Sequence, residues 1–297
     1  MDEIRAAAND IVTAVTMRER TDVRLPPMMV AFIVLSYIAV LLYYASTLYG
    51  SYDTVPLPQL FTLAALFTIG AGLLIAIFYL LINRDSNHSA REANLRTAMI
   101  RYAESMNVVC GADLINGIQR MKETDEMIRS NEKSGKGGLH LMLILVPIAV
   151  GLTIMVLTGD TDRFTDIVCW SYGASLALAV LMTPSIITFP RRHEAAALGF
   201  FDAWCGIAPS LGLSDEKMKV TIGCRSFWAS LILTVATVGI FALFWLYALF
   251  DDMNRHFDEQ WYFEDTLLKG IRDKENNFRR DGVPRGVNYV LEDNWVK

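Results

Sequence analysis

The sequence predicts an all-α, polytopic membrane protein with about five transmembrane helices, and three observations lead to this prediction. Hydrophobic residues make up 53% of the 297 residues and charged residues only 20%, which is more apolar than a typical soluble domain. The 27 Lys and Arg residues all lie outside four windows, at 28–82, 139–158, 164–189 and 226–250. These windows are continuously apolar and long enough for helices that cross a hydrocarbon core of roughly 30 Å.

Residues 1–27 precede the first window and carry an amphipathic pattern. Ile4, Ala8, Ile11 and Val15 recur at spacings of four, three and four residues, so they share one side of a helix. Such a helix lies either on a membrane surface or on the chain's own cytoplasmic part. Both alternatives are open at this point.

The apolar windows divide into two hairpins and a fifth helix. Window 28–82 is long enough for two spans, and a polar break around Asp53 and Pro56 separates them. Residues 139–189 form a second transmembrane hairpin, and residues 226–250 form the fifth transmembrane helix. The spans are predicted at about 28–49, 58–82, 139–158, 165–188 and 226–250.

The distribution of Lys and Arg predicts a cell-membrane protein with a cytoplasmic N-terminus, because cytoplasmic loops are enriched in these residues. The link 46–57 has none, and the link 159–164 has only Arg163. Residues 83–138, in contrast, carry nine. Both ends of each hairpin are therefore predicted to lie on the cytoplasmic side, and so is the segment 83–138 that joins the hairpins.

Segment 190–225 contains a moderately apolar stretch, 195–212, that admits three interpretations. It is a sixth span, a re-entrant loop or an amphipathic interfacial helix. Asp202 at its centre argues against a crossing, because a carboxylate in mid-membrane is costly. The side on which the tail 251–297 lies depends on this choice, which the sequence leaves open.

Residues 83–138 are predicted to form a cytoplasmic helical hairpin. Leu95, Met99, Tyr102 and Met106 supply the apolar stripe of its first helix, and the chain breaks at 110–113 before the second. At the start of the first helix, Ser89 and Glu92 have the spacing of a capping box.

Residues 251–297 are predicted to form a helical arm followed by a C-terminal tail. Aromatic residues on both parts are candidate docking residues for a partner protein, or else they pack on the chain itself. These candidates are Trp261, Phe263, Tyr289 and Trp295.

Three of the apolar runs end alike, in a polar cluster followed by a single histidine. These histidines are His88, His193 and His256. If all three exits face the cytoplasm, the imidazoles converge into a metal or haem site, since imidazole is the commonest metal ligand. The alternative is three structural histidines at the membrane interface. No other cofactor is expected.

Small residues within the windows are candidates for close helix packing. They are Gly70, Gly72, Gly173, Ala177 and Gly239.

Part of the fifth window resembles a known family. Thr237 and Gly239, followed by Trp245, Tyr247 and Asn254, are similar to a small prokaryotic membrane domain of unknown function marked by a Thr-x-Gly and Trp-x-Tyr motif. The resemblance covers about residues 234–258. It implies membrane residence and nothing more, because that family has no established activity.

The composition and the motifs favour a function that is not enzymatic. A formal net charge of −5 excludes a strongly basic nucleic-acid binder, and no Walker or Gly-x-Ser-x-Gly motif is present. We therefore expect a membrane scaffold or accessory subunit that binds partner proteins, or further copies of itself, through the hairpin and the arm. One alternative is a transporter or channel for a small neutral solute. The other is a redox or metal-binding membrane subunit that uses the exit histidines.

Overall fold

The computed structural model describes residues 2–26, 28–31, 57–110, 114–132, 142, 145–147, 149–151, 153, 154, 157, 164–237 and 240–280. Its elements are α1 (Asp2–Thr16), α2 (Arg18–Thr21), α4 (Leu57–Cys110), α5 (Ile115–Asn131), α7 (Phe164–Ile207), the 3-10 helix η1 (Pro209–Leu211), α8 (Phe227–Ala236) and α9 (Ile240–Arg280). Every element in these ranges is helical, which confirms the all-α class. In the same ranges, no helix combines the length and the apolarity that a membrane crossing requires.

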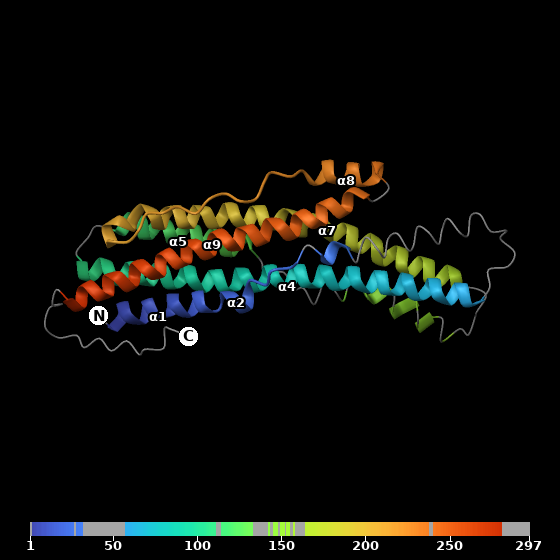
Figure 1. Ribbon diagram of the computed structural model, residues 1–297, viewed down its shortest axis with the longest axis horizontal. Helices are drawn as coiled ribbons and strands as arrows, with labels where there is room; N and C mark the ends of the chain where they lie inside the picture. Colours follow the sequence, from blue (N-terminus) through green and yellow to red (C-terminus); the bar gives the residue numbers. More distant parts are fainter. Residues whose placement is uncertain are drawn as a thin grey trace.

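Three long helices, α4, α7 and α9, run along the length of the molecule, and α1 and α5 pack beside one end of them (Figure 1). Each long helix begins in an apolar window and continues without interruption into the following polar segment. The break predicted at 110–113 coincides with the end of α4 at Cys110 and the start of α5 at Ile115.

The larger core lies where α1 and α5 join the three long helices. The predicted stripe of Leu95, Met99, Tyr102 and Met106 is buried in it. The apolar side of α1 packs on the same core through Ile4, Ala7, Ile11, Ala14 and Val15. The described structure therefore matches the second of the two alternatives for residues 1–27, packing on the chain itself.

A smaller core lies farther along the described bundle, where the apolar windows give way to the polar segments. It combines Leu25 and Val30 with residues of α4, α7 and α9, namely Ile77, Leu81, Ile82, Ile186, Ile187, Leu246, Leu249 and Phe250. The two cores occupy different stretches of the same three helices.

The stretch 195–212 packs inside the bundle, an arrangement that differs from all three interpretations of the sequence. Helix α7 continues to Ile207, and Phe200, Phe201 and Trp204 are buried in the larger core. Asp202 lies on the opposite, exposed side, where its carboxylate is 3.2 Å from Lys217 Nζ. The apolar side of this stretch packs on other helices, so its apolar residues do not require a membrane.

The single helix predicted at 226–250 is wrong. The described residues of this window form two helices, with α8 ending at Ala236 and α9 beginning at Ile240, and α8 lies alongside the start of α9. The Thr237 hydroxyl accepts a hydrogen bond of 2.9 Å from the backbone N–H of Phe241. This bond satisfies one of the free N–H groups of a helix start, which favours a new helix over continuation.

Candidate metal centre

A layer of buried polar side chains separates the two apolar cores. Between the last residues of the smaller core and the first of the larger, α4 buries Arg84, Asp85, His88, Arg91 and Glu92; α7 buries His193 and Glu194; and α9 buries Asp252, His256 and Gln260. Because each long helix passes from one core to the other, the polar residues of the three helices lie at a common level.

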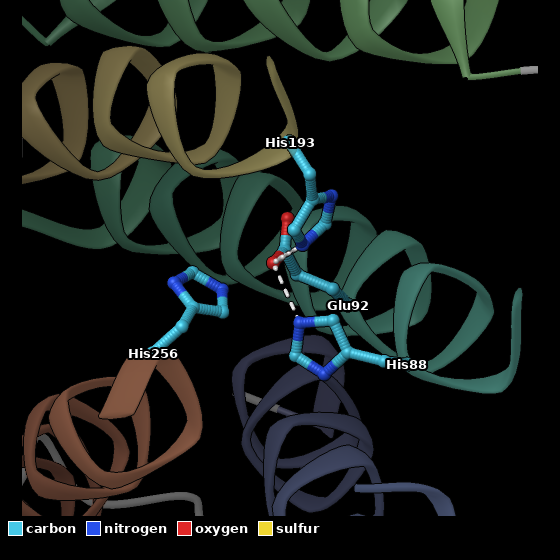
Figure 2. Close-up of side chains that lie close together, drawn as sticks. All are labelled: His88, Glu92, His193 and His256. Carbon is cyan, nitrogen blue, oxygen red and sulfur yellow. Dashed lines mark ion pairs between the residues drawn. The ribbon is translucent and has the colours of Figure 1, made fainter. Parts of the chain in front are cut away.

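The three exit histidines meet in this layer, each carried by a different long helix (Figure 2). The ring centroids of His88 and His193 are 4.9 Å apart, and each is 5.4 Å from the ring of His256. All three side chains are fully buried. The convergence expected from the three exits is therefore present.

Glu92 lies among the three imidazoles (Figure 2). It follows His88 by four residues on α4, which places both side chains on one face of the helix. Its Oε2 atom is 3.1 Å from His193 Nε2 and 3.6 Å from His88 Nε2. One potential ligand atom from each of the four residues lies within 4.8 Å of the others.

This spacing is close to that of a metal site. Tetrahedral ligands at the zinc bond lengths of about 2.0–2.1 Å stand about 3.4 Å from one another. A maximum separation of 4.8 Å therefore requires each of the four side chains to move inward by less than about 1 Å, which side-chain rotation provides.

The Nδ1 atom of each histidine faces a second carboxylate, contributed by a different part of the chain. His88 Nδ1 is 2.9 Å from Asp22 Oδ1 and His193 Nδ1 is 2.6 Å from Glu132 Oε1, both within hydrogen-bond distance. His256 Nδ1 lies 3.6 Å from Glu194 Oε1 and makes no hydrogen bond. Metal-binding histidines almost always donate their second N–H to such a partner, which orients the ring and leaves the other nitrogen free for the metal.

The atoms that face the common centre make no hydrogen bonds. Among the described residues, Nε2 of His88, His193 and His256 and Oε2 of Glu92 are buried without a hydrogen bond. Although His193 and Glu92 are close enough for an ion pair, they are not aligned for a hydrogen bond. Each such atom costs about 1–3 kcal/mol, and one cation at the centre would satisfy all four.

The electrostatics of the cluster differ from one histidine to the next. Burial lowers the pKa of His88 to about 3, although Asp22 opposes this shift. Burial also acts to lower the pKa of His193, but Glu92 and Glu132 outweigh it and raise the pKa to about 10. For Glu92, burial opposes ionisation, whereas His193 and Arg96 hold its pKa well below the usual range.

Two arginines of α4 anchor the surrounding carboxylates. Arg91 donates to Asp22 Oδ2 at 2.9 Å and to Glu264 Oε1 at 2.6 Å. Arg96 contacts Glu92 itself and donates to Asp125 Oδ1 at 2.8 Å. Buried carboxylates of this kind persist only when they are paired, and Arg91 and Arg96 supply that pairing around the centre.

The sequence identified the histidines but not Glu92 as part of the site. Helix α4 runs without interruption from Leu57 to Cys110, so Ser89 and Glu92 lie in its interior and the predicted capping box is wrong. The four-residue spacing from His88 to Glu92 was the available signal. Asp22 and Glu132 are distant in sequence from the histidines that they face, by 66 and 61 residues, and no local pattern pointed to them.

The predicted docking residues that the structure describes contact the chain itself. Trp261 Nε1 donates to Asp22 Oδ2 at 2.8 Å, and the ring lies against the guanidinium groups of Arg18 and Arg24. Phe263 is buried in the larger core, which leaves almost none of its surface for a partner. Tyr289 and Trp295 lie outside the described residues.

The residues predicted to allow close helix packing are only partly described. Gly70 and Gly72 lie on α4, and Gly173 and Ala177 on α7. The structure does not describe the side-chain surroundings of these four residues. Gly239 itself lies outside the described residues.

Comparisons with family models, curated proteins and solved structures find no match to this chain. The resemblance of residues 234–258 to a prokaryotic membrane domain therefore stays a prediction, as does the scaffold function. The function of the centre has to be inferred from its geometry.

Proposed function

We propose that this chain is a membrane-attached metal-binding protein in which His88, Glu92, His193 and His256 hold one divalent transition-metal ion. The observation that carries the proposal is the set of four converging ligand atoms, all buried and without hydrogen-bond partners. Three imidazoles and one carboxylate favour Zn²⁺ and neighbouring transition metals. Mg²⁺ and Ca²⁺ prefer oxygen ligands alone.

The surrounding carboxylates support the same proposal. Asp22, Glu132 and Glu194 come from three different segments, and each faces the Nδ1 atom of one histidine. In His88 and His193 the outward Nδ1 atom is within hydrogen-bond distance of its carboxylate, and the Nε2 atom at the centre makes no hydrogen bond. The proposed role is to bind the ion and hold the three long helices together, and it assigns no reaction.

Membrane attachment is the second part of the proposal, and it rests on two observations. The first is the absence of Lys and Arg from the four apolar windows. The second is that large apolar side chains within these windows are exposed, among them Leu157, Trp170, Trp228, Ile232, Val235 and Phe244. Exposed apolar surface marks a membrane or protein contact. The N-terminus and the metal centre would then lie on the cytoplasmic side.

The test is metal binding by the full chain, purified in a mild detergent with an affinity tag that lacks histidine. We expect about one Zn²⁺ per chain, measured by elemental analysis and by competition with a chromophoric chelator. The variants His193→Ala and Glu92→Gln should each weaken binding by more than the roughly 10–100-fold that loss of a supporting residue costs.

The control is His140→Gln, which replaces the fourth histidine of the chain and should bind zinc as the natural sequence does. If the natural sequence binds no transition metal, or if both variants bind as tightly as the control, the proposal is wrong. Circular dichroism on each variant separates loss of the site from loss of the helical fold.

A further inference from the structure

A cavity of about 280 Å³ lies between α7, α9 and the segment 222–225, just beyond the metal centre along the bundle. One part of its wall is apolar, formed by Ile187, Trp245 and Leu249. The other part is mainly basic, formed by Arg191, Arg192 and Arg225 together with the carboxylate of Asp252. No residue of this cavity is a ligand of the proposed metal centre.

The basic part of the wall contains guanidinium groups that are not paired with a carboxylate in the described structure. Arg225 is committed to Asp252, with Nη1 2.9 Å from Oδ2 and Nη2 3.0 Å from Oδ1, and Arg255 also pairs with this carboxylate. Within the described ranges, neither Arg191 nor Arg192 has a carboxylate partner, and Arg191 Nη1 donates to the Cys224 sulfur at 2.7 Å. Two guanidinium groups are therefore available for an anion.

A third donor in the wall also lacks an acceptor. The indole Nε1 of Trp245 is buried and has no hydrogen-bond partner in the described structure. A buried indole N–H usually finds an acceptor, so its lack of one indicates a missing polar group. An anion with oxygen atoms would supply it, beside an apolar surface that suits a hydrocarbon chain.

The position of the cavity narrows the choice of ligand. It lies at the ends of two apolar windows. Its lining crosses the end of window 164–189, stops just before window 226–250 begins and includes Leu249 at the other end of that window. In a membrane protein this is the cytoplasmic interface, where Trp residues gather and where basic pockets between helices bind the headgroups of anionic lipids. Ligand pockets typically measure about 300–1,000 Å³, so the cavity suits a headgroup better than a whole lipid.

We propose that this cavity binds the phosphate headgroup of an anionic phospholipid from the cytoplasmic leaflet. Arg191 and Arg192 would neutralise the phosphate, and the Trp245 indole would donate to one of its oxygens. The acyl chains would lie along the exposed apolar residues of the neighbouring windows. This inference rests on the membrane part of the proposed function and is independent of the metal.

The test is lipid binding by the full chain in lipid nanodiscs, followed by native mass spectrometry of the protein with its retained lipids. We expect phosphatidylglycerol to be retained in preference to phosphatidylcholine. The double variant Arg191→Gln/Arg192→Gln should bind phosphatidylglycerol about 30-fold more weakly, since each basic residue near a membrane contributes about 1 kcal/mol. Trp245→Phe, which removes only the indole donor, should give a smaller loss in the same direction.

The matched control is Arg101→Gln/Arg120→Gln, which removes the same charge from exposed positions on α4 and α5. Equal loss in both double variants would overturn the proposal, and so would equal retention of the two lipids by the natural sequence. Inorganic phosphate in detergent solution is a third arm. If it binds at this cavity as tightly as the lipid does, the site serves free phosphate and the lipid proposal fails.

Zinc content is measured on the same samples, which separates this proposal from the metal centre. The arginine variant should keep its zinc while losing the lipid. If the natural sequence binds the lipid but contains no zinc, the result contradicts the proposed metal centre and leaves the lipid proposal standing.

Discussion

The substitution Asp22→Asn tests whether the carboxylates around the centre support a metal. Asp22 is buried, and its Oδ1 is 2.9 Å from His88 Nδ1. Its Oδ2 accepts from Arg91 Nη2 at 2.9 Å and from Trp261 Nε1 at 2.8 Å. An asparagine has one oxygen and one NH₂ group. Two N–H donors face the second position, whereas the first faces His88 and the Thr21 hydroxyl, which can donate to Met17 O instead. The oxygen is therefore favoured at the second position, and the NH₂ group then faces His88.

This arrangement changes the tautomer of His88. The NH₂ group can only donate, so Nδ1 becomes the acceptor and the proton moves to Nε2, the atom that would otherwise bind the metal. Turning the amide around instead leaves two buried donors against an NH₂ group. Either outcome weakens the site, and loss of such a supporting residue typically costs about 10–100-fold in metal affinity, or about 1.4–2.7 kcal/mol.

The assay is zinc competition with a chromophoric chelator at fixed pH and ionic strength. Asp258→Asn is the matched control. Asp258 makes an exposed ion pair with Arg24, and an exposed pair contributes little to the free energy of unfolding. If Asp22→Asn and Asp258→Asn bind zinc equally well, the proposed role of Asp22 is refuted. A loss of helical signal in Asp22→Asn alone would assign the residue to folding.

Three further predictions concern the stability of the bundle, measured by thermal or denaturant unfolding in mild detergent. Trp204→Ala removes the side chain of a residue that is 1% exposed in the larger core and should cost about 3–5 kcal/mol. Gly117→Ala should destabilise because the new methyl group meets Ile207, whereas Gly206→Ala, which meets nothing within 4 Å, should stabilise by about 0.5–1 kcal/mol. Burial raises the pKa of Glu264 from 4.5 to about 7, so its contribution to stability is complete below pH 4.5 and is lost as the pH rises through 7. Glu264→Gln should therefore reduce the fall in the unfolding midpoint between about pH 5 and about pH 8. An unchanged slope would refute this assignment.

Local patterns predicted the helices, and they offered the convergence of the histidines as one of two alternatives. The apolar stripe of Leu95 and Met106 has the period of a helix, and its burial follows from that period. His88, His193 and His256 each follow an apolar run, so they lie at one level once the runs are aligned. The same repeated pattern therefore encodes both the packing and the site.

What packs against an apolar face was not predictable from local pattern. The stretch 195–212 is apolar enough to suggest a membrane, but Phe200 and Trp204 face the larger core. Likewise, the partner of His88 is Asp22, 66 residues away in sequence. Such pairings depend on the arrangement of whole helices, and a single sequence contains no direct record of it.

The length of the three long helices has a mechanical consequence. Helix α4 has 54 residues and would extend about 80 Å at 1.5 Å per residue. It joins the apolar windows to the far end of the bundle as a single rod, as α7 and α9 do for their own segments. An ion bound by all three rods fixes their axial positions, since a slide of one turn, about 5.4 Å, would carry a histidine out of reach. The proposed ion would thus tie the apolar part of each rod to the other two.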